Sequence, residues 1–205
     1  MKPLTWYFDV ISPFAYLQST QHHRFTPYAH ITYKPVVFAG LLQHFGNVGP
    51  AEIAPKRQWT FEHVAWLAHS LGVPMQPPAA HPFNPVALLR SIVAAGSTAA
   101  AVRTVFDYVW VQRGDLLDLS ALHAALGIDS STIAQPAIKT ALHGNGQAAI
   151  ASGVFGVPTT VVDGRTFWGV DSTDMLLAYL QGDAWFESPA YLAVKNFPQG
   201  VQRLR

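Results

Sequence analysis

Apolar and polar residues alternate at the start of the chain and then change their period. Residues Leu4 to Val10 alternate and are rich in aromatic side chains, which is typical of a strand. Ser12-Pro13 ends this pattern, and an apolar run with helical spacing follows it. A second stretch, Ile31 to Phe38, predicts another strand. Strand, helix and strand in this order predict a βαβ unit whose two strands are parallel.

The middle of the chain has a helical pattern. Between residues 54 and 143, apolar side chains recur every three or four positions. The segments with this stripe are Trp59 to Leu71, Ala87 to Ala95, Thr98 to Arg113 and Ser120 to Leu126. A proline-rich link, residues 72–85, lacks a regular pattern. We therefore predict that residues 54–143 form an all-helical insertion.

Strand signals return after the helical block. A helical stretch, Gln147 to Ser152, precedes two β-rich runs, Val154 to Val162 and Thr166 to Trp168. Asp163-Gly164 between these runs predicts a hairpin. The whole order predicts an α/β fold, in which residues 1–53 and 144–205 form one domain that residues 54–143 interrupt.

The end of the chain predicts one more helix and a tail. We expect Asp171 to cap a helix from Asp174 to Leu180, because an acidic side chain at a helix start stabilises it. Residues 181–205 are expected to form an irregular tail. The aromatic side chains expected to pack this tail are Trp185, Phe186, Tyr191 and Phe197.

Composition excludes several classes of function. Half of the residues are apolar and 12% are charged, which indicates a compact globular protein. The formal net charge is +1 and the Lys and Arg residues are scattered, so we expect no nucleic-acid partner. No apolar run approaches the ~20 residues of a membrane-spanning helix, and the N-terminus lacks a signal-peptide pattern. We therefore expect a cytoplasmic protein with no membrane partner.

The absence of cysteine limits the chemistry further. With no Cys in the sequence, disulfides, thiolate zinc sites, a cysteine nucleophile and a thiol redox cycle are all excluded. The pairs His22-His23 and His63 with His69 lack the i, i+4 zinc-binding arrangement with a nearby acid. We expect these histidines to be surface or packing residues, and we expect no metal site.

Ser12 is the first candidate for chemistry. It follows the first strand and precedes Pro13, which places a hydroxyl at a helix N-cap and proline at the first helical position. Helix capping alone accounts for this arrangement. The alternative is that Ser12 and the free amides of the helix face a thiolate or another anion, because a helix N-terminus lowers the pKa of a thiol.

A second motif lies far along the chain. Val157-Pro158-Thr159 precedes the third predicted strand, where a cis-proline opposite the first helix is expected. Together with Ser12-Pro13-Phe14-Ala15 it resembles the cis-proline loop and Cys-x-x-Cys helix of the thioredoxin superfamily, with Ser12 and Ala15 in place of the cysteines. The helical block between the two halves is similar to the DsbA-like branch. The resemblance implies a thioredoxin-like fold with an all-helical insertion.

Within that branch, four strings resemble the 2-hydroxychromene-2-carboxylate isomerases and kappa-class glutathione transferases. They are FDVISPFAYL at 8–17, GNVGP at 46–50, FGVPT at 155–159 and FWGVD at 167–171. The resemblance spans most of residues 4–181 and implies glutathione as the cofactor. It would bind with its thiol at Ser12, with its cysteinyl backbone paired to Val157 beside Pro158, and with its γ-glutamyl end near Gly169 to Ser172.

Other site residues have weaker signals. Asp171 is the expected partner of the γ-glutamyl ammonium, and Ser172 stands where the family would place a basic residue. Asn47 is a candidate to contact polar groups of the ligand, or it shapes a turn. Lys56 and Arg57 are candidates to attract a substrate carboxylate, or they form a solvated helix start. Aromatic residues that either wall a pocket for a flat substrate or belong to the core are Phe38, Phe45, Trp59, Phe61 and Trp66.

The resemblance implies an isomerase. It would act on 2-hydroxychromene-2-carboxylate or a related intermediate of aromatic degradation, by reversible thiolate addition, bond rotation and release of the thiol. Two alternatives stay open: a kappa-like glutathione transferase, and a noncatalytic thioredoxin-fold binding module. A disulfide oxidoreductase is excluded because the chain has no cysteine. The resemblance also implies a homodimer.

Overall fold

One four-stranded sheet lies at the centre of the part of the chain that the structure describes. The computed structural model describes residues 1–195, 197, 198 and 200. β1 (Lys2–Phe8) pairs in parallel with β2 (Ala29–Pro35). On its other edge β1 pairs antiparallel with β3 (Thr159–Val162), which forms a hairpin with β4 (Arg165–Trp168). The strand order is β2-β1-β3-β4, and the predicted parallel βαβ unit and Asp-Gly hairpin are both confirmed.

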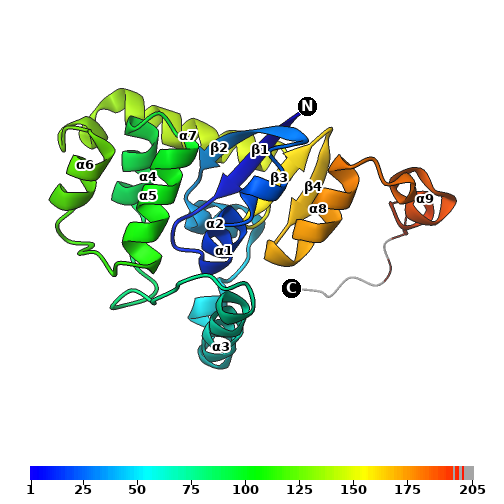
Figure 1. Ribbon diagram of the computed structural model, residues 1–205, viewed down its shortest axis with the longest axis horizontal. Helices are drawn as coiled ribbons and strands as arrows, with labels where there is room; N and C mark the ends of the chain where they lie inside the picture. The colour runs from blue at the N-terminus through cyan, green and yellow to red at the C-terminus, as the bar shows by residue number, and fades with distance from the viewer. Residues whose placement is uncertain (196, 199, 201–205) are drawn as a thin grey trace.

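Helices separate β1, β2 and β3 along the chain and follow β4. α1 (Pro13–Ser19) joins the two parallel strands, and α2 (Phe38–Phe45) follows β2. The middle of the chain forms α3 (Ala54–Ser70), α4 (Val86–Ala94), α5 (Ala99–Trp110), α6 (Ser120–Leu126) and α7 (Pro136–Ala151), and the last helices are α8 (Thr173–Leu180) and α9 (Pro189–Lys195). Figure 1 shows α4 to α7 gathered at one end, α3 apart from them, and α9 at the opposite end.

The sheet and the helical block share one hydrophobic core. Successive residues of β1 face opposite sides of the sheet: Trp6 and Phe8 join the larger buried cluster, whereas Tyr7 belongs to a second, smaller one. The larger cluster also contains Phe106 and Trp110 of α5, so the insertion packs directly on the strand that leads to Ser12. The predicted thioredoxin-like fold with a helical insertion is confirmed, and residue 143, the expected end of the insertion, lies inside α7.

Several predicted element boundaries were wrong, among them the end of the first strand, which lies at Phe8 and not at Val10. The second strand ends at Pro35, and Phe38 opens a helix, α2, that the pattern did not indicate. The third strand begins only at Thr159, because Pro158 has no N–H to donate to a strand ladder. The helix expected from Gln147 begins at Pro136, since Gly144 and Gly146 interrupt its apolar pattern without ending it.

The end of the chain also differs from the prediction. Asp171 lies in a 3-10 turn, Val170–Ser172, and Ser172 rather than Asp171 occupies the N-cap of α8, without a side-chain capping bond. The tail contains a 3-10 turn, Ala184–Glu187, and α9, so it is not irregular. Phe186 is buried as expected, but Phe197 is 81% exposed and does not pack the tail. Residues 196, 199 and 201–205 of the predicted tail lie outside the described residues.

Candidate active site

Ser12 caps α1, and its hydroxyl hydrogen forms no hydrogen bond with any residue that the structure describes. Its backbone is extended, and its Oγ accepts a hydrogen bond of 3.2 Å from the backbone N–H of Ala15. Pro13 occupies the first turn, where a missing N–H costs nothing. A serine hydroxyl accepts and donates at the same time, and Ser12 donates to no group among the described residues. The capping role and a role in binding an anion are therefore compatible.

Asp9 lies buried beneath the turn between β1 and α1. Its carboxylate accepts hydrogen bonds from the backbone N–H groups of Ile11 (3.0 Å) and Phe38 (2.8 Å). Burial raises the pKa of Asp9 to about 7, although these backbone donors oppose the shift. The side chain thus ties the start of α1 to the start of α2. Sequence reasoning missed this residue, and the available signal was an acid directly after an apolar strand.

The helical insertion fixes the same turn from the other side. Trp110 Nε1 donates to the carbonyl oxygen of Val10 at 2.8 Å, and His81 Nε2 lies 2.9 Å from the carbonyl oxygen of Ile11. A carbonyl only accepts, so His81 Nε2 carries the hydrogen. Burial lowers the pKa of His81, which favours this neutral form. Arg57 in turn donates two hydrogen bonds to the His81 carbonyl.

Val157 and Pro158 form the second part of the site. The peptide bond between them is cis, as predicted. The Pro158 carbonyl accepts a hydrogen bond of 2.9 Å from the N–H of Gly169. In the described part of the chain, no hydrogen bond is made by the backbone N–H or C=O of Val157. Val157 therefore offers a free backbone edge of the kind that pairs with an extended peptide.

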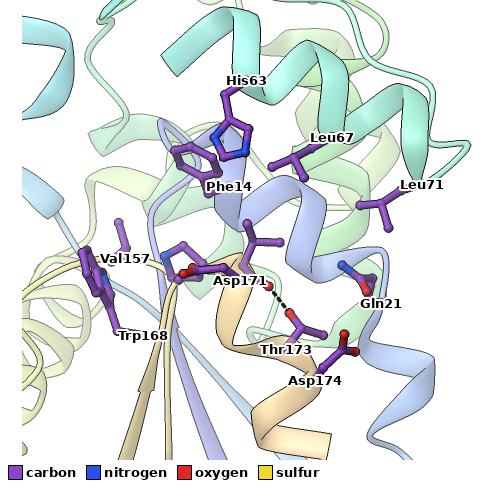
Figure 2. A pocket seen from close by; sticks show the side chains of 13 residues that line it. Phe14, Gln21, His63, Leu67, Leu71, Val157, Trp168, Asp171, Thr173 and Asp174 are labelled. Atoms are coloured by element: carbon purple, nitrogen blue, oxygen red, sulfur yellow. Dashed lines mark hydrogen bonds between the residues drawn. The ribbon is translucent and has the colours of Figure 1, made fainter. Parts of the chain in front are cut away.

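A cleft of about 430 Å³ lies between α3, α1, the Val157-Pro158 loop and the start of α8. Figure 2 shows His63, Leu67 and Leu71 projecting from α3 on one side, with Asp171, Thr173 and Asp174 on the other. The residues that line the cleft are Phe14, Gln21, His63, Leu67, Leu71, Val157, Pro158, Trp168, Gly169, Val170, Asp171, Thr173 and Asp174. Its lining is mostly apolar with a few polar groups, which is the usual character of a small-molecule site.

Asp171 is an exposed carboxylate at the edge of this cleft. It forms no hydrogen bond or ion pair with any residue that the structure describes. The segment that carries it is anchored, because the Gly169 carbonyl accepts hydrogen bonds from Gln18 Nε2 (3.0 Å) and Ser172 Oγ (2.8 Å). Asp171 is thus held at the cleft with its charge available to a cationic group.

Of the predicted site residues, Val157, Pro158 and Asp171 line the cleft. Ser12 is 8% exposed and does not itself line the cleft, although Phe14, two residues further along α1, does.

The remaining predicted residues also lie outside the lining. Asn47 is exposed in the turn after α2, and Lys56 is exposed in the first turn of α3. The guanidinium of Arg57 is bound to His81, and Ser172 turns its hydroxyl to Gly169. Trp59 is 63% exposed and stacks on His63, which itself lines the cleft. Sequence reasoning missed five lining residues, and it set His63 aside. The five are Gln21, Leu67, Leu71, Thr173 and Asp174.

Comparison with known proteins identifies the family. Residues 4–181 match the model of the DSBA-like thioredoxin domain. This chain belongs to the DSBA-like thioredoxin family. This DSBA-like chain has Ser12 and Ala15 at the start of α1 and contains no cysteine. Among the described residues no helix is long and apolar enough to cross a bilayer.

Two kinds of enzyme are similar to this DSBA-like chain. Glutathione S-transferase kappa 1 of Rattus norvegicus is 29% identical over 90% of this chain and 92% of its own length. A 2-hydroxychromene-2-carboxylate isomerase of a Pseudomonas species (strain C18) is 31% identical over 83% and 86%. A solved structure of 2-hydroxychromene-2-carboxylate isomerase superposes with a TM-score of 0.78, at 28% identity, over 93% of this chain and 98% of that one. These relatives are isomerases and a transferase, so the chain groups with enzymes.

Proposed function

We propose that this protein is a glutathione-dependent isomerase of 2-hydroxychromene-2-carboxylate or a related aromatic intermediate. The observation that carries the proposal is Ser12, whose oxygen caps α1 while its hydroxyl hydrogen has no acceptor among the described residues. A hydroxyl in that position donates to a thiolate and stabilises it. The isomerases and the kappa-class transferase similar to this chain support glutathione as the source of that thiolate.

Three unpartnered groups of the chain fit the chemistry of glutathione. The Ser12 hydroxyl suits a thiolate, the free backbone edge of Val157 suits a peptide backbone, and the Asp171 carboxylate suits an ammonium group. When bound, glutathione supplies a nucleophile that adds reversibly to a conjugated substrate, which turns a double bond into a single bond that rotates. Ser12 would hold the thiol in its ionised form, and the apolar cleft wall would position the flat substrate and exclude water.

A kappa-like glutathione transferase is the second candidate. The similarity to the rat enzyme favours it, and its overlap with this chain is as extensive as that of the isomerases. A transferase would use the same three groups and release a conjugate. The two activities differ in thiol balance, because an isomerase returns the thiol and a transferase consumes it. A noncatalytic binding module would bind glutathione or an aromatic ligand without turnover.

The decisive experiment follows 2-hydroxychromene-2-carboxylate with and without glutathione while free thiol is titrated. We expect glutathione-dependent isomerisation at constant thiol, reduced at least tenfold in both Ser12→Ala and Ser12→Asp. Ser12→Asp keeps an N-cap oxygen but places a carboxylate beside the thiolate, so it separates loss of the cap from loss of the donor. The control is Ser19→Ala on the same helix, whose hydroxyl only bonds the Tyr16 carbonyl.

Other results of this experiment would favour one of the two alternative functions. Equal loss of thiol and substrate would replace the isomerase with the transferase. Glutathione binding without turnover of this substrate or of a general electrophile would favour the noncatalytic module. A cytoplasmic location and a homodimeric state belong to the same proposal, and cell fractionation and light scattering test them.

A further inference from the structure

The α3 side of the cleft carries a side chain to which no function has been given. His63 is half-buried and lines the cleft beside Leu67 and Leu71. Figure 2 shows its ring next to Phe14, across the cleft from Asp171. Among the described residues that line the cleft, none is Lys or Arg, and His63 alone can carry a positive charge.

Aromatic neighbours hold the His63 ring in place. Trp59, one turn earlier on α3, stacks on it with ring centroids 5.8 Å apart and planes 20° apart. Trp66 lies on the other side at 6.5 Å and 22°, and Phe14 of α1 approaches at 5.9 Å. Stacking on an indole suits both the neutral and the cationic imidazole. No described residue hydrogen-bonds to the ring nitrogens of His63, so they remain available to a ligand.

Charge is distributed unevenly across the cleft. Asp171 and Asp174 lie on the α8 side, and Asp174 pairs with Arg24 at 2.7 Å. On α3 itself, the neighbouring acid Glu62 is exposed and accepts a hydrogen bond from Gln58. An anionic group in the cleft is therefore repelled by the carboxylate of Asp171 on the α8 side and is favoured near His63 on the α3 side.

The basic residues that the sequence suggested for a substrate carboxylate are less suitable. Arg57 uses its Nε and one terminal nitrogen on the His81 carbonyl, at 3.2 and 3.0 Å. Lys56 is exposed and lies seven residues, about two helical turns, before His63, the first residue of α3 that lines the cleft. The ring nitrogens of His63 can donate a hydrogen bond to a carboxylate, and the neighbouring Phe14 and Leu67 offer an apolar surface to an aromatic ring. A flat aromatic acid needs both features.

We propose that His63 determines substrate specificity by binding the carboxylate of a planar aromatic acid whose ring lies against Phe14 and Leu67. This inference rests on the proposed function for the class of substrate, but the residue and its role follow from the cleft. The contact is a charge-assisted hydrogen bond beside a hydrophobic surface. An uncharged aromatic ligand of the same shape would keep the stacking and lose the hydrogen bond.

Equilibrium binding measurements test the proposed role of His63 in the absence of glutathione and without turnover. The probes are 2-naphthoate and its neutral counterpart 2-naphthamide, titrated by calorimetry under identical buffer conditions. The variant is His63→Gln, which keeps a polar side chain of similar length. The control is His69→Gln on the same helix, because His69 is exposed and lines a separate hollow with Phe61 and Met75.

We expect wild-type protein to bind 2-naphthoate more tightly than 2-naphthamide. In His63→Gln the affinity for 2-naphthoate should fall about tenfold, the typical effect of losing one charge-assisted hydrogen bond, while the affinity for 2-naphthamide stays within twofold. His69→Gln should bind both as wild type does. Equal losses for both ligands, no loss for either, or no binding of 2-naphthoate by wild type would overturn the proposal. If the isomerase assay fails while the selective loss is observed, only the proposed function is wrong.

Discussion

The carboxylate of Asp9 accepts a 2.8 Å hydrogen bond from the backbone N–H of Phe38, so one buried acid connects the starts of two helices. The same side chain also accepts from Ile11, in the turn that carries Ser12. A charge so completely buried is costly unless hydrogen bonds compensate it. Asp9 therefore links the stability of the fold to the position of the candidate site.

The first prediction concerns pH and the stability of the fold. The pKa of Asp9 is raised to about 7 from an ordinary value of 3.8, so between these two values the folded state keeps a proton that the unfolded chain releases. The stability that Asp9 contributes is therefore complete below about pH 4 and is lost as the pH rises to 7. Relative to Asp9→Asn, the free energy of unfolding of wild type should fall by roughly 3 kcal/mol between about pH 4.5 and 7.5.

Urea unfolding of both proteins across this range measures the difference. Asp163→Asn serves as a control that should show almost no pH dependence in this range, because hydrogen bonds from Lys2 and Tyr179 lower the pKa of Asp163 and its contribution is lost only below about pH 3.8. A difference between wild type and Asp9→Asn that stays constant with pH would mean that Asp9 does not titrate in this range.

The second prediction concerns Gly169, which keeps space for Asp171. Its φ is +87°, and a Cβ at this position would clash with Oδ1 of Asp171. Gly169→Ala should displace this carboxylate and weaken glutathione binding about tenfold, as expected for loss of a charge-assisted contact. Gly164→Ala is the matched control, because Gly164 also has a positive φ, +70°, but no atom lies within 4 Å of its Cβ position.

Calorimetric titration with glutathione compares the two variants. Both should lose some stability, because alanine is strained at positive φ. Only Gly169→Ala should lose affinity for glutathione. If both variants bind glutathione as wild type does, Asp171 is not its ammonium partner.

The third prediction tests how the insertion holds the turn before Ser12. Trp110→Phe removes the donor to the Val10 carbonyl and leaves that buried group unpaired, at a cost of about 1–3 kcal/mol. Trp66→Phe is the control because Trp66 is 62% exposed, and a surface change of this kind costs about 0.5 kcal/mol or less. Urea unfolding at one pH measures both. If both variants lose a similar free energy of unfolding, the hydrogen bond of Trp110 does not contribute measurably to stability.

The sequence by itself determined the elements whose signals are local. Asp163-Gly164 indicated the hairpin, Ser12-Pro13 indicated the start of α1, and the cis peptide before Pro158 was expected from the order of the elements. The hairpin and the helix start depend on the dihedral preferences and hydrogen bonds of adjacent residues, so a short string suffices to predict them. The family resemblance rested on the same strings, and it is confirmed.

The tertiary structure alone decided which side chains share the cleft. The apolar spacing of α3 predicted a helix, but it could not show that His63 faces Phe14 while Lys56 and Asn47 lie outside the lining. It also could not show that Asp9 reaches Phe38 or that His81 reaches Ile11. The physical reason is that a helical pattern encodes which face is apolar, whereas the element that covers this face is selected by packing between segments distant in sequence.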